Sequence, residues 1–152
     1  MKAKKSLGQN FLQDEGVIHN IVKIINPQAG EKIIEIGPGQ GAITEHLQAS
    51  GADLQLIELD HDLIPLLQQK YASHDNVTLH HLDALKLKLD NGPYKVVGNL
   101  PYNISSPLLI NMLYQSKEVS QMIFMLQKEV VKRICASPGE KLFGRLSVML
   151  QH

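Results

Sequence analysis

KIIEIGPGQG, residues 32–41, joins a short β-branched run to a glycine cluster, and the helical pattern AITEHLQAS (42–50) follows at once. Glycines let a strand turn sharply into a helix and bring the backbone close to a ligand, while the helix start offers free N–H groups. Gly51 is expected to end this helix as its C-cap. The segment therefore predicts a strand–loop–helix unit with a loop suited to binding.

The same alternation continues along the chain. Further strands are predicted at 54–59, 77–83, 94–100 and 121–127, and helices at 14–26, 61–72, 107–115 and 128–136, while a helix is favoured over a strand at 145–151. Asp14 is expected to cap the helix at 14–26, and Pro65 to lie in the first turn of the helix at 61–72. Ser105 or Ser106 is expected to cap a helix that begins at Pro107. Alternating strands and helices over short connections indicate an α/β fold with a parallel, doubly wound sheet.

Composition limits the function only broadly. The 152 residues are enough for one domain, and 15 basic and 15 acidic side chains cancel, so net charge indicates no partner. Lys2, Lys4 and Lys5 are expected to form a solvated tail. Cys135 is the single cysteine, which excludes an internal disulfide and suits a reducing compartment, so we expect an inert thiol and a cytoplasmic protein. No membrane-spanning stretch or signal peptide is recognisable.

Polar or glycine residues follow each of the first four predicted strands. They are the loop Gly37–Gly41, Glu58, Asp83 and the segment 99–102. The carboxyl ends of parallel strands form the ligand-binding edge of such sheets. A carboxylate at Glu58 can accept from ribose hydroxyls and one at Asp83 from an adenine amine. Asp60 is instead expected to cap the following helix. A tight loop that binds nothing and two surface acids remain the alternative at these positions.

The sequence around the glycine loop favours a cationic ligand over a diphosphate. Its spacing is GxGxG, unlike the dinucleotide pattern, and the chain has neither GK[ST] nor an arginine in this loop. Glu35, the only ionisable group near the loop in sequence, is acidic. S-adenosylmethionine carries a sulfonium and an ammonium, so these residues point to methyl transfer.

The segment VVGNLPYNIS (96–105) breaks a strand at Asn99-Leu100-Pro101-Tyr102. An adenine N6 amine is a poor nucleophile because its lone pair is conjugated with the ring. Acceptance of both its hydrogens, by the Asn99 side-chain oxygen and the Leu100 or Pro101 carbonyl, would draw the nitrogen toward tetrahedral geometry. Pro101 would fix the backbone, and Tyr102 would stack on a flipped base. The alternative is a strand-ending turn with a core tyrosine.

Several segments together resemble the ribosomal RNA adenine dimethyltransferases, most closely the bacterial enzymes that act on two adjacent adenosines near the 3′ end of small-subunit (16S) rRNA. These segments are GQNFL (8–12), EIGPGQGAIT (35–44), IELD (57–60), GNLPYNIS (98–105), MLQKEVV (125–131) and GRLSVM (144–149). The resemblance implies a Rossmann-like class I methyltransferase core over 1–152 that uses S-adenosylmethionine, with small-subunit rRNA or the assembling subunit as partner, no membrane and a monomeric state.

The resemblance also implies roles for individual residues. Asn10, Leu12, Gly37 and Gly39 would contact the cofactor, Glu58 its ribose, Asp83 its adenine, and Asn99 both cofactor and target amine. Lys128 and Arg145 lie in family-typical segments without an assigned role. Family members continue for roughly a hundred further residues, a usual domain size, which supply the last strands of the sheet and a helical RNA-binding domain. This chain is expected to lack them.

Three other readings stay open. The chain can be a cofactor-binding fragment without turnover, a large-subunit rRNA methyltransferase that confers antibiotic resistance, or a relative of the DNA adenine methyltransferases. No metal is expected, because adjacent His80 and His81 face opposite sides of a strand and no HExxH spacing occurs.

Overall fold

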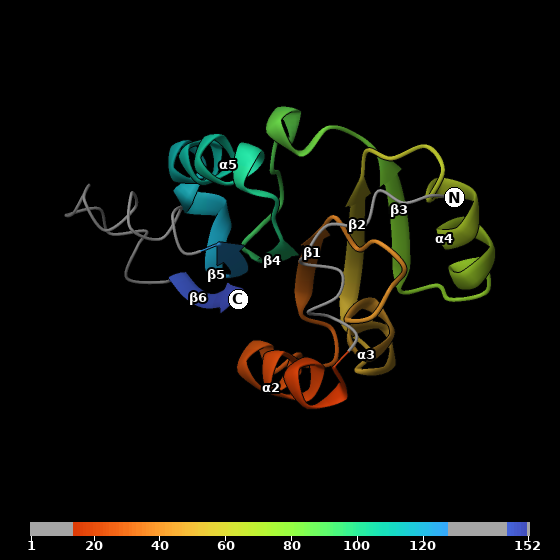
Figure 1. Ribbon diagram of the computed structural model, residues 1–152. Coiled ribbons are helices and arrows are strands. Elements are labelled where there is room, and N and C mark those ends of the chain that lie inside the picture. Colours follow the sequence, from red (N-terminus) through yellow and green to blue (C-terminus); the bar gives the residue numbers. More distant parts are fainter. Residues whose placement is uncertain (1–13, 128–145, 152) are drawn as a thin grey trace.

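The computed structural model describes residues 14–127 and 146–151. These form a six-stranded sheet in the order β3-β2-β1-β4-β5-β6, and every neighbouring pair is parallel. The strands are β1 (Lys32–Ile36), β2 (Asp53–Glu58), β3 (Val77–His81), β4 (Tyr94–Asn99), β5 (Val119–Gln127) and β6 (Leu146–Gln151). The order reverses between β1 and β4, as Figure 1 shows, so the predicted doubly wound α/β fold is confirmed.

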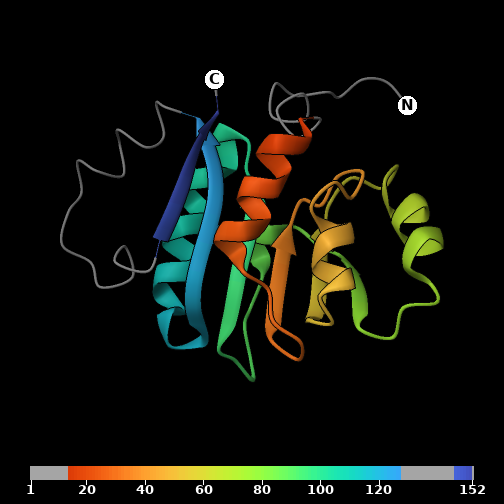
Figure 2. The same ribbon diagram turned by 90° about the horizontal axis from the view of Figure 1, so that it is seen from below.

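Helices cover both faces of the sheet. They are α2 (Glu15–Ile25), α3 (Thr44–Ala49), α4 (Ile64–Tyr71) and α5 (Tyr102–Tyr114), with short 3₁₀ helices η1 (Ala84–Lys86) and η2 (Ser116–Glu118). Figure 2 shows α2 and α3 in front of the strands and α5 behind them. One hydrophobic core joins α5 and η1 to the sheet, and a second joins α2, α3 and α4 to its other face. None of the described helices has the length and apolarity needed to cross a bilayer.

Most predicted elements are confirmed within a few residues. Asp14 caps α2 as expected, since its side chain accepts from the Gly16 and Val17 N–H groups at 2.8 and 3.2 Å. The prediction that Asp60 caps the helix after β2 is wrong. A turn closed by the Leu63 N–H on the Asp60 carbonyl (3.0 Å) precedes α4, and the Asp60 carboxylate accepts from the Asp62 N–H instead.

The helix after β4 begins earlier than predicted. Helix α5 starts at Tyr102 with Pro101 as N-cap, and Pro107 lies inside it rather than at its start. Ser105 does not cap this helix, because its buried hydroxyl donates to the Pro101 carbonyl at 2.8 Å. Because proline has no N–H, Pro107 cannot donate the helical hydrogen bond to the Asn103 carbonyl. Asn103 is exposed, so water can donate to that carbonyl instead.

The helix favoured at 145–151 is also wrong. Residues Leu146–Gln151 form β6, which pairs in parallel with Met122–Gln127 of β5. Long-range ladder pairing decides a short apolar segment of this kind, and a single sequence does not contain that information. The helix predicted at 128–136, together with Cys135, lies outside the described residues.

Gly98 lets β1 and β4 approach closely at the point where the strand order reverses. It pairs with Ile36, and a Cβ placed on Gly98 would lie 2.8 Å from the Ile36 carbonyl oxygen. No real side chain tolerates that contact without a backbone shift. Gly98 therefore keeps the two strand ends of the predicted site together.

Candidate functional site

The carboxyl ends of four strands meet at one edge of the sheet, as predicted. Gly37 donates its N–H to the Ile57 carbonyl at 2.9 Å, and Leu82 donates to the Glu58 carbonyl at 3.0 Å. On the other side, a Cβ on Gly37 would lie 3.7 Å from the Asn99 carbonyl oxygen. The edge therefore presents the end of β4, the glycine loop, the end of β2 and the end of β3 in that order. Three spacings between strands cover about 14 Å.

The glycine loop has the backbone that its sequence predicts. Gly37, Gly39 and Gly41 have φ values of 68°, 61° and 92°, a region that other residues rarely adopt. The Gly41 N–H donates to the Pro38 carbonyl at 2.9 Å, which closes the turn. At the same position a Cβ would lie 3.1 Å from Lys70 Nζ. Glycine is thus required by conformation, and a side chain at this position would also displace the Lys70 ammonium by a few tenths of an ångström.

Glu58 is buried at the end of β2 and binds the neighbouring backbone. Its Oε2 accepts from the Leu59 and Asp60 N–H groups at 3.1 and 3.0 Å, and its Oε1 accepts from the Gly39 N–H at 3.3 Å. A carboxylate has about four acceptor positions, so one remains for a ligand hydroxyl. The side chain of Leu59 beside it is 60% exposed, an apolar surface at the mouth of the site that sequence analysis did not identify.

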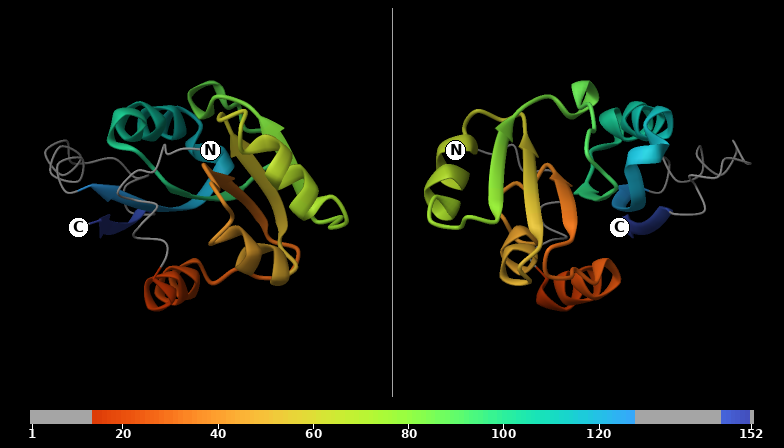
Figure 3. Two further views of the ribbon diagram at one scale, coloured as in Figure 1. Left: turned by 45° about the vertical axis from the view of Figure 1, so that its right-hand side comes forward. Right: turned by 180° about the vertical axis from the view of Figure 1, so that it is seen from behind.

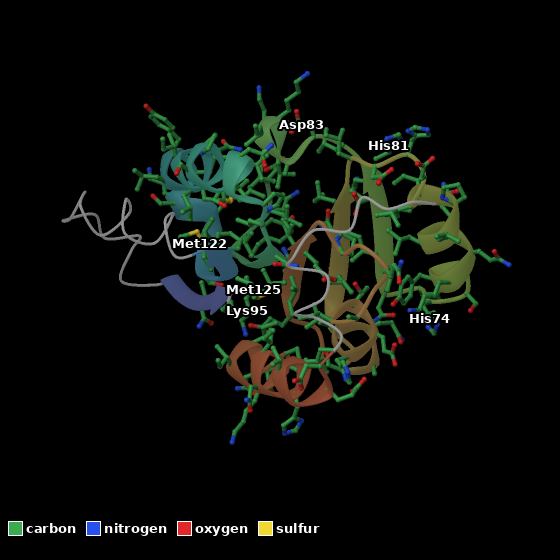
Figure 4. All side chains as sticks on the ribbon, viewed as in Figure 1. His74, His81, Asp83, Lys95, Met122 and Met125 are labelled. Atoms are coloured by element: carbon green, nitrogen blue, oxygen red, sulfur yellow. The ribbon has the colours of Figure 1, made fainter. Side chains whose placement is uncertain are left out.

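Asp83 lies two residues beyond the end of β3, which is shorter than predicted. It caps η1, and its Oδ1 accepts from the Leu85 N–H at 2.9 Å. Figure 4 labels Asp83 at the top of the molecule, on the side of η1 and α5, and His81 on the far side toward α4. The half-buried Asp83 carboxylate thus ends the row that begins at Asn99.

Asn99 and Leu100 differ in their surroundings. Asn99 is half-buried at the last position of β4, whereas Leu100 is 1% exposed and packs in the core beneath α5. The Leu100 N–H donates to the Met125 carbonyl at 3.2 Å and anchors the segment to β5. The Pro101 carbonyl already accepts from Ser105 and from the Ile104 N–H. Of the two predicted backbone acceptors, Leu100 is therefore the one that we retain.

Glu35 lies behind the glycine loop rather than in its mouth. It is 4% exposed, and its Oε1 accepts from the Thr44 hydroxyl at 2.6 Å. Burial raises the pKa of the Glu35 carboxyl from 4.5 to about 7, the bond from Thr44 opposes this shift, and the charge of Glu58 adds to it. Glu35 therefore stabilises the start of α3 through its hydrogen bond with Thr44.

The raised pKa of Glu35 predicts a pH-dependent stability. Because the folded state favours the protonated acid, this contribution is complete below pH 4.5 and is lost as the pH rises to about 7. The loss amounts to about 3 kcal/mol at most, at about 1.4 kcal/mol per pH unit. We expect the melting temperature of the unmodified chain to fall between pH 5 and 8 for this reason, and Glu35→Gln to remove this part of the fall. The exposed Glu45→Gln serves as the control, and an identical fall in the Glu35 variant would contradict the assignment.

The glycine loop also has a basic neighbour in space, which the acidic group near it in sequence did not predict. Lys70, on α4, extends its Nζ to the Gln40 carbonyl at 3.4 Å and to Glu45 at 3.9 Å. The buried hydroxyl of the adjacent Tyr71 has no hydrogen-bond partner among the described residues, and burial raises its pKa to about 12. Thirty residues separate Lys70 from Gln40, so no local pattern in the sequence could have identified this contact.

Some predicted residues cannot be placed. Asn10, Leu12, Lys128 and Arg145 lie outside the described residues, as does the side chain of Tyr102.

Within 14–127 and 146–151, ligand-type atoms of Asp60, His61 and Asp62 lie within 4.8 Å of one another. These neighbours are half-buried or exposed, and His61 pairs with Asp62 at 3.3 Å. Exposed acidic groups of this kind do not by themselves make a metal site.

Comparisons with known sequences agree over the whole chain. Residues 1–152 match the family described as "Ribosomal RNA adenine dimethylase". The "Ribosomal RNA small subunit methyltransferase A" of Pseudomonas putida is 52% identical over 99% of this chain and 58% of its own length. The protein of the same name from Pseudomonas aeruginosa is 51% identical over 99% of this chain and 58% of its own length. The chain thus spans less than two thirds of these relatives.

Solved structures share the fold. A dimethyladenosine transferase from Plasmodium falciparum superposes with a TM-score of 0.67 and 26% identity, over 80% of this chain and 45% of that chain. The 23S rRNA methyltransferase ErmE superposes with a TM-score of 0.65 and 24% identity, over 72% of this chain and 44% of that chain. At this identity ErmE supports the fold alone, which is the expected class I methyltransferase core.

Proposed function

The chain belongs to the ribosomal RNA adenine dimethylase family, and we propose that it takes part in methyl transfer from S-adenosylmethionine to the N6 amines of two adjacent adenosines of small-subunit rRNA. The observation that carries the proposal is the single edge on which Asn99, Gly37, Glu58 and Asp83 follow one another across four neighbouring strands. The names of the relatives, which specify the small subunit, favour this substrate over large-subunit rRNA.

The residues of the edge fit this cofactor. Glu58 keeps one acceptor position for a ribose hydroxyl, and Asp83 lies at the far end of the row for an adenine amine. Gly37 and Gly39 keep the loop backbone clear of side chains between these groups and Asn99. When bound, S-adenosylmethionine supplies an electrophilic methyl carbon. Residues 1–152 would form its binding core, with Asn10 and Leu12 as further contacts.

Asn99 and Leu100 would orient the target amine. In the proposed arrangement, the Asn99 side-chain oxygen and the Leu100 carbonyl each accept one N6 hydrogen, which concentrates the nitrogen lone pair toward its reaction partner. No strong base is needed, because positioning and electrostatics supply the rate enhancement and the methylated nitrogen would be acidic enough to give its surplus proton to water. Pro101 holds the extended backbone (φ −63°, ψ 151°) that leads into α5, and Tyr102 would stack on the extruded base.

Two measurements on the same sample test the proposal. Isothermal titration with S-adenosylmethionine reports cofactor binding, and transfer of labelled methyl groups to small subunits that lack the modification reports catalysis. We expect both. Binding without transfer would favour the second candidate, a cofactor-binding core, which the 58% coverage of the relatives makes reasonable. Absence of binding would refute both candidates.

Glu58→Gln is expected to weaken cofactor binding at least tenfold. Only one of the two terminal atoms of glutamine can accept, so its NH2 group would face either the Leu59 and Asp60 N–H groups or the Gly39 N–H and the ligand hydroxyl. Titration calorimetry measures the effect. Asp53→Asn, at the exposed start of the same strand, is the matched control. Equal affinities in the two variants would contradict the role of Glu58.

Location and partners follow from the proposal. We infer a cytoplasmic protein that works as a monomer on rRNA or the assembling small subunit. Size-exclusion chromatography of the chain with and without the subunit would check both the oligomeric state and the partner.

A further inference from the structure

The outer side of α5 is exposed and uncharged. Asn103, Pro107, Ile110 and Tyr114 are spaced four, three and four residues apart, which places them along one side of the helix. Ile110 is 54% exposed and Tyr114 is 85% exposed. This side begins at Asn103, two residues after Pro101 and beside the proposed target-binding residues, and Tyr114 lies about 17 Å further along the helix axis.

A lysine-bearing segment is fixed alongside this helix. Asn111 Nδ2 and Gln115 Nε2 donate to the Leu87 carbonyl at 3.1 and 2.9 Å, and Gln115 Oε1 accepts from the Leu89 N–H at 2.6 Å. Leu87 is buried, whereas Lys86 and Lys88 on either side of it are exposed. Figure 3 shows η1, where this segment starts, next to α5.

Exposed lysines outnumber exposed acids on the combined surface. Residues 84–89 and 101–117 contain no aspartate or glutamate, although the chain has 15 acidic residues. Lys117, exposed in η2, adds a third cation near Gln115. Three acids border the surface: Asp90 is exposed, whereas the half-buried Asp83 and Glu118 accept hydrogen bonds from the Leu85 N–H and from the Gly92 N–H at 3.0 Å. The surface therefore carries three exposed lysines, Lys86, Lys88 and Lys117, against one exposed acid at its border.

We propose that this surface, the α5 track (Lys86, Lys88, Ile110, Tyr114 and Lys117), binds the single-stranded rRNA that flanks the target adenosine. The inference rests on the proposed function and names the path of its substrate. Lysines neutralise phosphates and release counterions, while Tyr114 offers a face on which a base can stack and Ile110 an apolar contact. Its start beside the proposed target-binding residues and its exposed lysines favour RNA over a protein partner.

The test is filter binding of the chain to a transcript of the 3′ region of small-subunit rRNA at several salt concentrations. The triple variant Lys86→Gln, Lys88→Gln, Lys117→Gln is expected to bind at least tenfold more weakly at 0.1 M salt. Its salt dependence, the slope of log K against log salt, is expected to fall by about 2, at about 0.7 per phosphate contact. Tyr114→Ala is expected to weaken binding severalfold without changing this slope.

Controls separate this result from general damage. Lys23→Gln on α2 and Leu66→Ala on α4, both exposed on the other side of the molecule, are expected to leave RNA affinity unchanged. Replacement of the three lysines by arginine is expected to restore affinity. All variants are expected to bind S-adenosylmethionine as the unmodified chain does.

Three outcomes would overturn the inference. They are undiminished affinity and slope in the triple variant, absence of RNA binding by the unmodified chain, and a loss of binding to intact subunits but not to the transcript, which would indicate a protein partner. If methyl transfer to small subunits persists in these cases, the proposed function stands and only the track is refuted. If cofactor binding also fails, the proposed function itself is wrong.

Discussion

Asn99→Ala is expected to reduce methyl transfer about a hundredfold or more while S-adenosylmethionine binding changes by less than tenfold. In the proposed site Asn99 supplies one of two acceptors for the target amine, and loss of one preorganised polar group of this kind costs two to three orders of magnitude in rate. Most proposed cofactor contacts come from β1, β2 and β3, so they remain. Single-turnover methylation together with calorimetry measures both quantities.

The matched control for this substitution is Asn20→Ala, on the exposed side of α2. It is expected to leave both quantities unchanged. Asn99→Asp keeps an acceptor oxygen but adds a charge beside a cationic donor, so we expect partial activity and unweakened cofactor binding. Unimpaired methylation by Asn99→Ala would refute the proposed hydrogen bond from the target amine to Asn99. The Leu100 carbonyl would then be the one proposed acceptor left.

Lys95→Ala is expected to lower the free energy of unfolding by about 3 kcal/mol, which corresponds to a melting temperature about 10 °C lower. Lys95 is buried in β4, and its Nζ donates to the Ile25 carbonyl at 2.6 Å and lies 2.9 Å from Glu31 Oε2. Figure 4 shows it next to α2. The alanine variant loses both contacts and leaves the carbonyl at the end of α2 without its donor.

A double-mutant cycle separates the ion pair from the other losses. Lys95→Met keeps the aliphatic stem, Glu31→Gln removes the opposite charge, and the two together give the coupling free energy, expected to exceed 1 kcal/mol. Lys23→Ala, at an exposed position of α2, is the control and is expected to change stability by less than 0.5 kcal/mol. A coupling near zero would mean that Lys95 stabilises the fold through the Ile25 carbonyl alone.

The predictable part of this fold is local in sequence. Apolar runs mark β1 to β5, glycines mark the loop at 37–41, and parallel topology places the strand ends on one edge. These patterns also bring Asn99 beside Gly37, although the two are 62 residues apart in the sequence. Acid positions such as Glu58 and Asp83 follow from the same rule, so the row of proposed ligand groups was predictable.

The unpredicted part depends on contacts between distant segments. Nothing near Lys95 indicates that its ammonium binds Glu31, 64 residues earlier, and Lys70 reaches the glycine loop only because α4 packs beside it. The strand at 146–151 depends on its partner β5. Similarly, Pro107 suggested a helix start, whereas the buried Ser105 and the strand end at Asn99 set the start at Tyr102.

Because the Pro101 carbonyl already accepts from Ser105, the proposed site has two acceptors for the target amine, and this number affects the rates of the first and second methyl transfers. If Asn99 and Leu100 are the two acceptors, the site matches an amine with two hydrogens. A monomethylated amine has one, which leaves one acceptor unsatisfied at a cost of about 1 kcal/mol or more, so the second transfer is expected to be slower and the intermediate to accumulate. A dimethylated amine has none, and its loss of both bonds would favour release of the finished nucleotide.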